Sequence, residues 1–485
     1  MKAVLLATLL LSSICAFAAD NVVFTQLVHR HGSRSPIVSA NSSLICNDGG
    51  FGCGELNLEG RDMLTQLGGL IRNRYPEQYV ETSYNWSKVY SRSTAKNRTI
   101  QSSDSMLRGL FPNTTDFYPV IFGQELADDM LLLSDNWASI SLRLSTHDLY
   151  NADILTAKRM ELFPDDNISQ AIVEELHIEG FAETMGMNYG LLLAQDIATC
   201  YMATGTILNG NYPTTNAHQT QLDALLFTFN TFRFAYNRSV DHWAASGSPA
   251  IELATKLVDN MKAVISGDEL HFMIEYSAHD TTLAPLASTL GALGEMTPVF
   301  GKMYLFELVK RGTAYFVRAL AGQPQQNPST HQYTTYYLPL SGLPTDGTLK
   351  DIYVVSNDTG VALDDFYNYI LSTAGTSGQG MCYIGDDAFE RIGCNVLDAP
   401  AKGSDCYKYR HECPNYGCPS GSYMSDWTTF ECTLIPVSKP SQNFTPAEST
   451  GIGIACTALG VVIGAVSMFF AGRAFGNKPT YEPLQ

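Results

Sequence analysis

Two short segments contain residue types suited to phosphate chemistry, and the first is residues 30–36, which read RHGSRSP. Arg30 and Arg34 can each donate paired, charge-assisted hydrogen bonds to phosphate oxygens. The segment directly follows the apolar run 22–28, which predicts a buried strand. Open α/β sheets bind ligands at the carboxyl ends of their strands. A solvated basic loop is the simpler alternative, but the glycine and proline of the segment fix a tight turn instead.

The second segment is residues 277–282, which read SAHDTT. His279 and Asp280 follow a predicted strand and open a predicted helix. Taken alone, Asp280 is either an ordinary helix N-cap or a reactive group. A third arginine, Arg92, lies at the end of another predicted strand, where it is a further candidate for phosphate binding.

Together these segments resemble the signatures of the histidine acid phosphatases, branch 2 of the histidine phosphatase superfamily. RHGSRSP fits the family's RHGxRxP at every fixed position, and SAHDTT fits its second, HD-containing signature. Residues 89–99 resemble its third, arginine-bearing segment. The resemblance runs from about Val22 to Gly380. One departure is Ala95, where many relatives carry an acidic residue, and this weakens a local salt bridge without reaching the reacting centre.

The resemblance implies that His31 attacks phosphorus in line and forms a phosphohistidine, while Asp280 protonates the leaving group. Four side chains are implied to bind the phosphate oxygens and stabilise their charge: Arg30, Arg34, Arg92 and His279. Surrounding positive charge lowers the pKa of a histidine, so the arginines also keep the nucleophile uncharged. The same arginines hold Asp280 ionised until bound phosphate offsets them, which predicts an acidic rate optimum.

Strands and helices alternate at both ends of the central region, so an α/β fold is expected: a three-layer sandwich with a mixed central sheet and helices on both faces. Residues 19–380 would form this phosphatase domain. The segment from about 123 to 264 has mostly helical patterns and is expected to be an inserted helical lobe. Short apolar runs predict strands at 22–28, 89–90, 272–277, 303–309 and 314–320. Helical patterns predict helices at 58–75 and over the stretch that ends at residue 290.

The two ends of the chain predict a secreted-pathway topology. Residues 1–18 have the basic start, short apolar run and Ala-x-Ala ending of a signal peptide. Residues 451–472 carry no charge and are long enough to cross a bilayer as one helix. Basic residues follow this span, so the tail 473–485 would face the cytosol and the protein would be type I. A cleaved lipid-anchor signal is the alternative, although such signals usually end in their apolar run.

The composition agrees with a lumenal or extracellular location. The formal charge is −18 without a basic cluster, which argues against nucleic-acid binding. Asn-x-Ser/Thr glycosylation acceptors occur only in the region predicted to be lumenal. They are Asn41, Asn85, Asn97, Asn113, Asn167, Asn237, Asn357 and Asn443.

Cysteines cluster in a membrane-proximal segment, residues 381–435, which a stalk, 436–450, joins to the span. In a secreted protein this cluster predicts a disulfide framework whose connectivity stays open. A zinc site is the alternative, but the tight CxxC pairs typical of one are absent from the sequence. Cys46 and Cys53 can close a loop. Cys200 makes the number of lumenal cysteines odd.

The expected partners are phosphate monoesters, a membrane and a clathrin adaptor. Tyr481 and Leu484 in the tail have the spacing of a tyrosine-based endosomal sorting signal. These ends resemble the layout of lysosomal-type and trypanosomatid membrane-bound acid phosphatases, and relatives are often homodimers. No cofactor is expected. His29 and His31 have metal-ligand spacing, but the neighbouring arginines disfavour a cation.

The sequence therefore predicts an acid phosphatase of the endosome, lysosome or cell surface. A second hypothesis is a narrower enzyme for inositol polyphosphates, nucleotides or lysophospholipids. Of these substrates, the acidic composition disfavours the inositol polyphosphates, whose binding needs additional Lys or Arg residues. A third is a membrane glycoprotein that uses the phosphatase fold mainly as a receptor or trafficking component.

Overall fold

The computed structural model describes residues 21–37, 52–79, 81–113, 115, 117–126, 129–133, 150, 152–325, 331–338 and 360–436. The predicted signal peptide, the span and tail with Tyr481 and Leu484, the stalk beyond residue 436, and the acceptors Asn41, Asn357 and Asn443 lie outside these residues. Within the described part of the chain, every helix is too short or too polar to cross a membrane. The chain divides into two compact units, residues 1–419 with 424–432 and residues 420–423 with 433–485, and the site lies in the first.

A mixed sheet forms the centre of the first unit, in the order β3-β2-β4-β1-β5-β6-β7, with β8 paired to β6. The neighbours β2, β4 and β1 run parallel, whereas β5 and β6 run antiparallel. The strands are β1 (Asn21–Arg30), β2 (Val89–Ser93), β3 (Ile121–Phe122), β4 (Met273–Ala278), β5 (Met303–Arg311), β6 (Ala314–Pro324), β7 (Tyr333–Tyr337) and β8 (Val361–Ala362). The mixed sheet and the predicted strands are confirmed.

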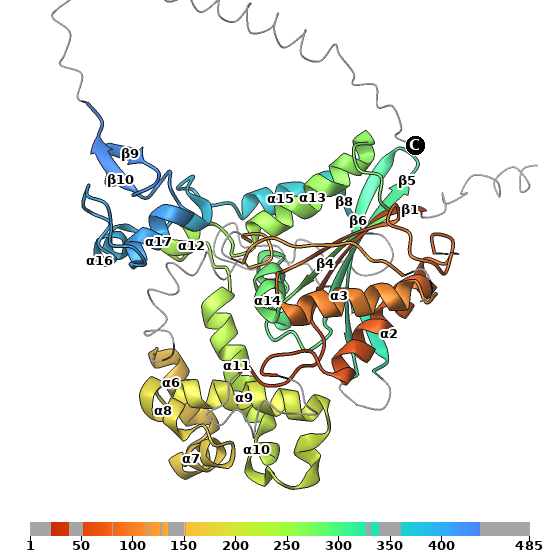
Figure 1. Cartoon of the computed structure of the whole chain (residues 1–485), viewed down its shortest axis with the longest axis horizontal. Coiled ribbons are helices and arrows are strands. Elements are labelled where there is room, and N and C mark those ends of the chain that lie inside the picture. Colours follow the sequence, from red (N-terminus) through yellow and green to blue (C-terminus); the bar gives the residue numbers. More distant parts are fainter. Residues whose placement is uncertain are drawn as a thin grey trace, which may run out of the picture. The chain divides into compact units, whose positions relative to one another are not determined.

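Helices cover both faces of this sheet (Figure 1). On β1, Leu27 packs against the helices α2 (Leu58–Arg74) and α3 (Asn97–Leu110). The next residue, Val28, belongs to the opposite core, with α13 (Ile251–Ser266), α14 (Asp280–Thr289) and α15 (Leu363–Ser372). Successive residues of a strand point to opposite faces, so a strand covered on both sides is buried on both, as β1 is from Phe24 to Arg30, including the polar Thr25 and Gln26.

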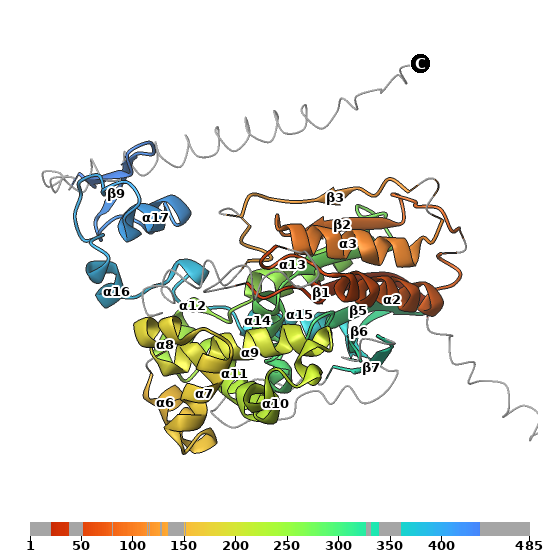
Figure 2. The same ribbon diagram turned by 60° about the horizontal axis from the view of Figure 1, so that its bottom comes forward.

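A second cluster of helices has a hydrophobic core of its own (Figure 2). Leu191 and Ile197 of α9 lie at its centre, fully buried. The segment predicted as a helical lobe therefore contains this cluster, whereas α13, at its end, packs on the sheet. The helices that lie between β3 and α13 in the chain are α6 (Asp153–Leu162), α7 (Asp166–Glu175), α8 (Glu179–Met185), α9 (Met187–Ala203), η2 (Thr206–Asn209), α10 (Pro213–Ala217), α11 (Gln219–Phe234) and α12 (Asp241–Ser246).

The cysteine cluster forms three disulfides: Cys382–Cys413, Cys394–Cys406 and Cys418–Cys432. Their sulfurs are thereby used, so the zinc alternative is wrong for these residues. The fully buried Arg410 donates hydrogen bonds to five backbone carbonyls of this segment, which satisfies its guanidinium without a carboxylate. Cys53 is also disulfide-bonded, and Cys46 lies outside the described residues. The remaining elements are η3 (Leu293–Glu295), η4 (Gly380–Cys382), α16 (Asp386–Arg391), α17 (Asp405–Glu412), β9 (Ser422–Asp426) and β10 (Glu431–Leu434).

Candidate active site

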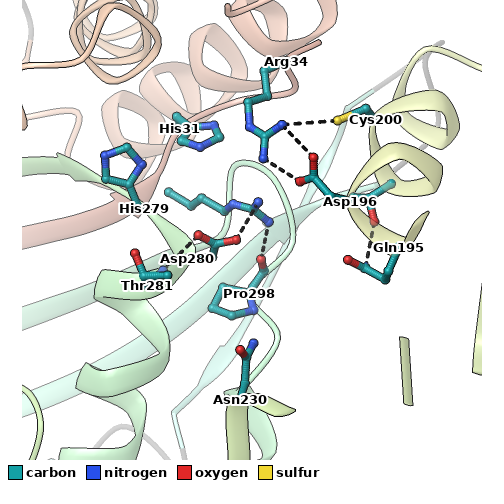
Figure 3. Close-up of polar contacts among 12 residues, drawn as sticks. His31, Arg34, Gln195, Asp196, Cys200, Asn230, His279, Asp280, Thr281 and Pro298 are labelled. Carbon is teal, nitrogen blue, oxygen red and sulfur yellow. Dashed lines mark hydrogen bonds and ion pairs between the residues drawn. The ribbon is translucent and has the colours of Figure 1, made fainter. Parts of the chain in front are cut away.

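The two signature segments meet because β1 and β4 are parallel neighbours. Arg30 is in register with Ala278, so His31 and His279 both follow at the same edge of the sheet. The backbone N–H of His31 donates to the carbonyl of Ala278 at 2.9 Å. The two imidazole rings lie edge to face with their centroids 5.4 Å apart (Figure 3).

The environment of His31 fixes its tautomer and its charge. Its side chain is buried, and Nδ1 lies 2.8 Å from the carbonyl oxygen of Gly32. A carbonyl only accepts hydrogen bonds, so Nδ1 carries the proton and Nε2 keeps its lone pair. Burial lowers the pKa of His31 well below 6.5, and the charges of Arg30 and Arg98 lower it further. The ring is thus neutral, with an unprotonated Nε2.

Arg30 and Arg34 are each held by a carboxylate. The Nη2 of Arg30 lies 2.8 Å from Oδ2 of Asp280, and its Nη1 donates to the carbonyl of Pro298 at 2.6 Å. Arg34 forms a two-pronged contact with Asp196 of α9, at 2.6 and 3.3 Å. Burial lowers the pKa of Arg34, but Asp196 outweighs it and raises the pKa overall. Both guanidinium groups stay charged in fixed positions.

The structure does not bring Arg92 to the other predicted phosphate ligands. Its guanidinium donates to Asp129 at 2.7 Å and to Gln124 at 2.9 Å. In its place Arg98, in the first turn of α3, acts electrostatically on both site histidines. Burial and the charge of Arg34 lower the pKa of Arg98 to about 10, which still leaves it cationic at acidic pH.

Three guanidinium groups near His31 share one feature. Within the part of the chain that the structure describes, their buried Nε–H groups have no hydrogen-bond acceptor: those of Arg30, Arg34 and Arg98. Buried donors without an acceptor are rare in folded proteins, and guanidinium groups match the oxygens of phosphate. This arrangement is what an oxyanion-binding cradle requires.

His279 and Asp280 complete the cradle at the start of α14. Nε2 of His279 lies 3.0 Å from Oγ1 of Thr94. Burial and the charge of Arg98 lower the pKa of His279 to about 3. Burial raises the pKa of Asp280, but Arg30 and Arg34 outweigh this effect, so the pKa is lowered overall. Asp280 is therefore an anion in the protein without a ligand.

Gly32 is required by a close approach between the signature loop and the start of α2. A Cβ atom on Gly32 would lie 2.2 Å from the carbonyl oxygen of Gly60. Asn57 caps this helix by accepting from the N–H of Gly60 at 2.9 Å, and donates to Oγ of Ser33 at 3.0 Å. The helix cap and the loop that carries His31 thus hold each other in place.

His29 does not share a site with His31. Its Nε2 lies 2.6 Å from Oε1 of Glu275, and its Nδ1 lies 3.1 Å from the carbonyl of Arg30. Both ring nitrogens are used inside the core. Glu275 also accepts from Ser91 and from Ser103, the latter at 2.8 Å. The metal-ligand spacing noted in the sequence therefore reflects a buried polar network.

A cleft of about 290 Å³ opens beside the cradle. It reaches from Arg30 and Asp280 to α9, α11 and the loop 297–299. Asp196, Arg98 and this loop were not predicted as site components. Asp196 carried no local signal, because a single carboxylate on a helix is most often a surface residue.

Comparisons with known proteins agree with the fold and the site described above. Residues 21–320 match the model of the histidine phosphatase superfamily, branch 2, and the chain belongs to this family. It is 26% identical to the human prostatic acid phosphatase over 311 residues, 62% of this chain and 77% of that protein. It is 26% identical to the bovine lysosomal acid phosphatase over 308 residues, 61% of this chain and 70% of that one.

Solved structures of phytases share the fold. The phytase of Klebsiella sp. ASR1 superposes with a TM-score of 0.54 at 14% identity, over 74% of this chain and 96% of that one. The Hafnia alvei phytase in complex with myo-inositol hexakis sulphate gives a TM-score of 0.52 at 14% identity, over 74% and 98%. At this level of identity the likeness concerns the fold alone.

Proposed function

We propose that this protein is an acid phosphatase that hydrolyses phosphate monoesters through a phosphohistidine on His31. The observation that carries the proposal is the unprotonated Nε2 of His31 among three guanidinium groups whose buried Nε–H groups lack an acceptor among the described residues. The acid phosphatases named above support the same activity.

Two displacements account for the reaction. In the first, Nε2 of His31 forms a bond to phosphorus while the ester P–O bond breaks, and Asp280 gives its proton to the leaving oxygen. In the second, water attacks the phosphohistidine, Asp280 takes a proton from that water, and the P–N bond breaks to release phosphate. The arginines stabilise the negative oxygens in both steps.

Asp280 must be protonated to act as an acid, although its pKa is lowered in the free protein. A bound phosphate dianion offsets the charges of Arg30 and Arg34 and raises the pKa of the carboxyl group. A low ambient pH helps this protonation. The site thus favours turnover in an acidic compartment, in agreement with a lysosomal relative.

The test is the hydrolysis of p-nitrophenyl phosphate at pH 5 by the full chain and by His31→Ala. We expect the variant to lose activity, and rapid quenching of the wild type to yield an acid-labile, base-stable phosphoenzyme. His218→Ala, a change on α11's N-terminal flank, serves as the matched control. Equal rates for wild type and His31→Ala would remove His31 from the mechanism. Inactivity of both would favour the receptor or trafficking role.

We also propose a type I membrane topology, with the catalytic domain in the endosomal or lysosomal lumen or outside the cell and Tyr481 on the cytosolic side. The disulfides of the membrane-proximal segment and the lysosomal relatives support a lumenal domain. Asn97, Asn167 and Asn237 are exposed, as glycan acceptors must be. Surface accumulation of a Tyr481→Ala variant tests the sorting signal and its adaptor, and glycosidase sensitivity tests the topology. A homodimer remains a prediction that sedimentation checks.

A further inference from the structure

The cleft beside the cradle has a distinct charge pattern on its walls. It is formed by α9, α11 and the loop 297–299 (Figure 3). Of the described residues that line it, Arg30 alone is cationic. Three are carboxylates: Asp196, Asp223 and Asp280. Among the described residues of these walls, the part of a substrate beyond the reacting phosphate therefore meets no positive side chain other than Arg30.

The positive charge of the cradle is itself largely balanced. Arg30 is paired with Asp280 at 2.8 Å, and Arg34 with Asp196 at 2.6 Å. With both site histidines neutral, Arg98 supplies the excess positive charge. This suits one phosphate group. It leaves little attraction for a second anionic group farther along the cleft.

The outer wall offers polar groups of another kind. Asp223, exposed on α11, accepts from Nε2 of Gln195 at 3.1 Å. The side-chain Nε2 of Gln219 lines the same cleft and is buried without a hydrogen-bond partner in the described structure. Asn230 donates to the carbonyl of Met296 at 2.8 Å, which leaves its own oxygen as an acceptor. Amides and a carboxylate both bind hydroxyl groups, and the carboxylate also attracts ammonium groups and repels a second phosphate.

We infer that this cleft selects singly phosphorylated alcohols whose leaving group carries hydroxyl or ammonium groups, and disfavours substrates with a second phosphate. Asp223 is the specificity-determining residue, because it adds negative charge beyond the ion pairs of the cradle. The inference rests on the proposed phosphatase activity. It also separates this chain from enzymes for polyphosphorylated inositols, which need cationic walls to hold several anionic groups.

The test compares substrates that share a skeleton. We expect the wild type to have a kcat/KM at least tenfold higher for fructose 6-phosphate than for fructose 1,6-bisphosphate, and to accept phosphoethanolamine. Asp223→Lys should narrow the first ratio about tenfold and slow phosphoethanolamine, because charge reversal a few ångströms away is worth roughly one factor of ten. Asp223→Asn removes the charge without reversing it, so it should lower the same substrate ratio and the rate with phosphoethanolamine by smaller factors.

Asp365→Lys, an equal charge reversal at an exposed position of α15, is the matched control and should leave the ratio unchanged. A wild type that prefers the bisphosphate, or a ratio that Asp223→Lys does not alter, overturns the inference while p-nitrophenyl phosphate is still hydrolysed. A wild type unable to hydrolyse p-nitrophenyl phosphate overturns the proposed function and the inference together.

Discussion

Arg92 and Arg98 lie on the same short stretch of chain, yet strand geometry gives them different surroundings. Ser91 of β2 faces α3, since its hydroxyl contacts Ser103 at 2.7 Å. The next residue, Arg92, points to the opposite face, where Asp129 binds it. Arg98 lies on α3 itself, which covers the face of the sheet toward which Leu27 and His29 of β1 are directed, and its charge adds to burial in lowering the pKa of His31.

The two arginines should therefore respond differently to mutation. Arg98→Ala removes a charge-assisted contact with phosphate worth about 1.5–3 kcal/mol, so the Ki of inorganic phosphate should rise roughly 10- to 100-fold. Arg92→Ala leaves the carboxylate of Asp129 without its cation, so it should lower the free energy of unfolding by about 1–3 kcal/mol with a smaller change in Ki. Inhibition kinetics and urea unfolding of both variants measure this. The reverse pattern would restore Arg92 as the phosphate ligand.

Asp280 should matter most where the leaving group is a poor one. An alkoxide must be protonated as it departs, whereas p-nitrophenolate leaves as a stable anion. We expect Asp280→Asn to lower kcat for glycerol 2-phosphate by about 10²–10⁴-fold and for p-nitrophenyl phosphate by clearly less. Rates for the two esters, at pH 5, provide the check. Equal losses would mean that Asp280 acts only by holding Arg30.

At the scale of elements, β1, β2, β4 and α3 are joined under the site by a buried network of side chains: His29, Ser91, Glu275 and Ser103. His29 also reaches the carbonyl of Arg30, so the network supports the start of the signature loop. Removing one partner of a buried hydrogen bond leaves the other polar group unsatisfied in the core.

His29→Phe alone should thus lower the free energy of unfolding by about 1–3 kcal/mol. The double variant His29→Phe/Glu275→Met replaces both partners with apolar groups of similar size and should recover much of that loss, since Ser91 and Ser103 can still bond to each other. Urea unfolding of the single and double variants gives the coupling. Additive losses would show that the two side chains do not stabilise each other.

The strands β1, β2, β4, β5 and β6 and the helices α2 and α14 could be predicted because apolar runs and amphipathic spacing are local properties. So could Arg30, His31, His279 and Asp280, which lie in two compact motifs. The identity of the third arginine could not be predicted, because both Arg92 and Arg98 lie in the third signature segment. Only the direction in which the side chain of Arg92 leaves β2 distinguishes them. The role of Asp196 could not be predicted for another reason. It lies 162 residues from Arg34 in the chain, and only the packing of α9 beside the signature loop brings the two side chains together.

At the scale of the whole molecule, the free protein carries a site that resists protonation. The pKa of His279 is lowered to about 3 by burial and by Arg98, against 6.5 when unfolded. The unfolded chain therefore binds more protons between these values. Stability falls as the pH drops below 6.5, by about 1.4 kcal/mol for each pH unit from this residue alone. A lysosomal pH thus destabilises the anion-free protein.

A bound dianion should reverse this effect, because it lets His279 and Asp280 take up protons. We expect sulfate, whose charge is constant over this range, to bind more tightly at pH 5 than at pH 7, by up to tenfold per pH unit for each proton taken up. Sulfate-dependent melting temperatures and calorimetry in two buffers of different ionisation enthalpy measure the linkage. His279→Asn and Asp280→Asn should each remove part of it, whereas the exposed Asp365→Asn should not. Sulfate affinity that is equal at both pH values would show that the cradle binds anions without proton uptake, and Asp280 would then need another source for the proton that it donates.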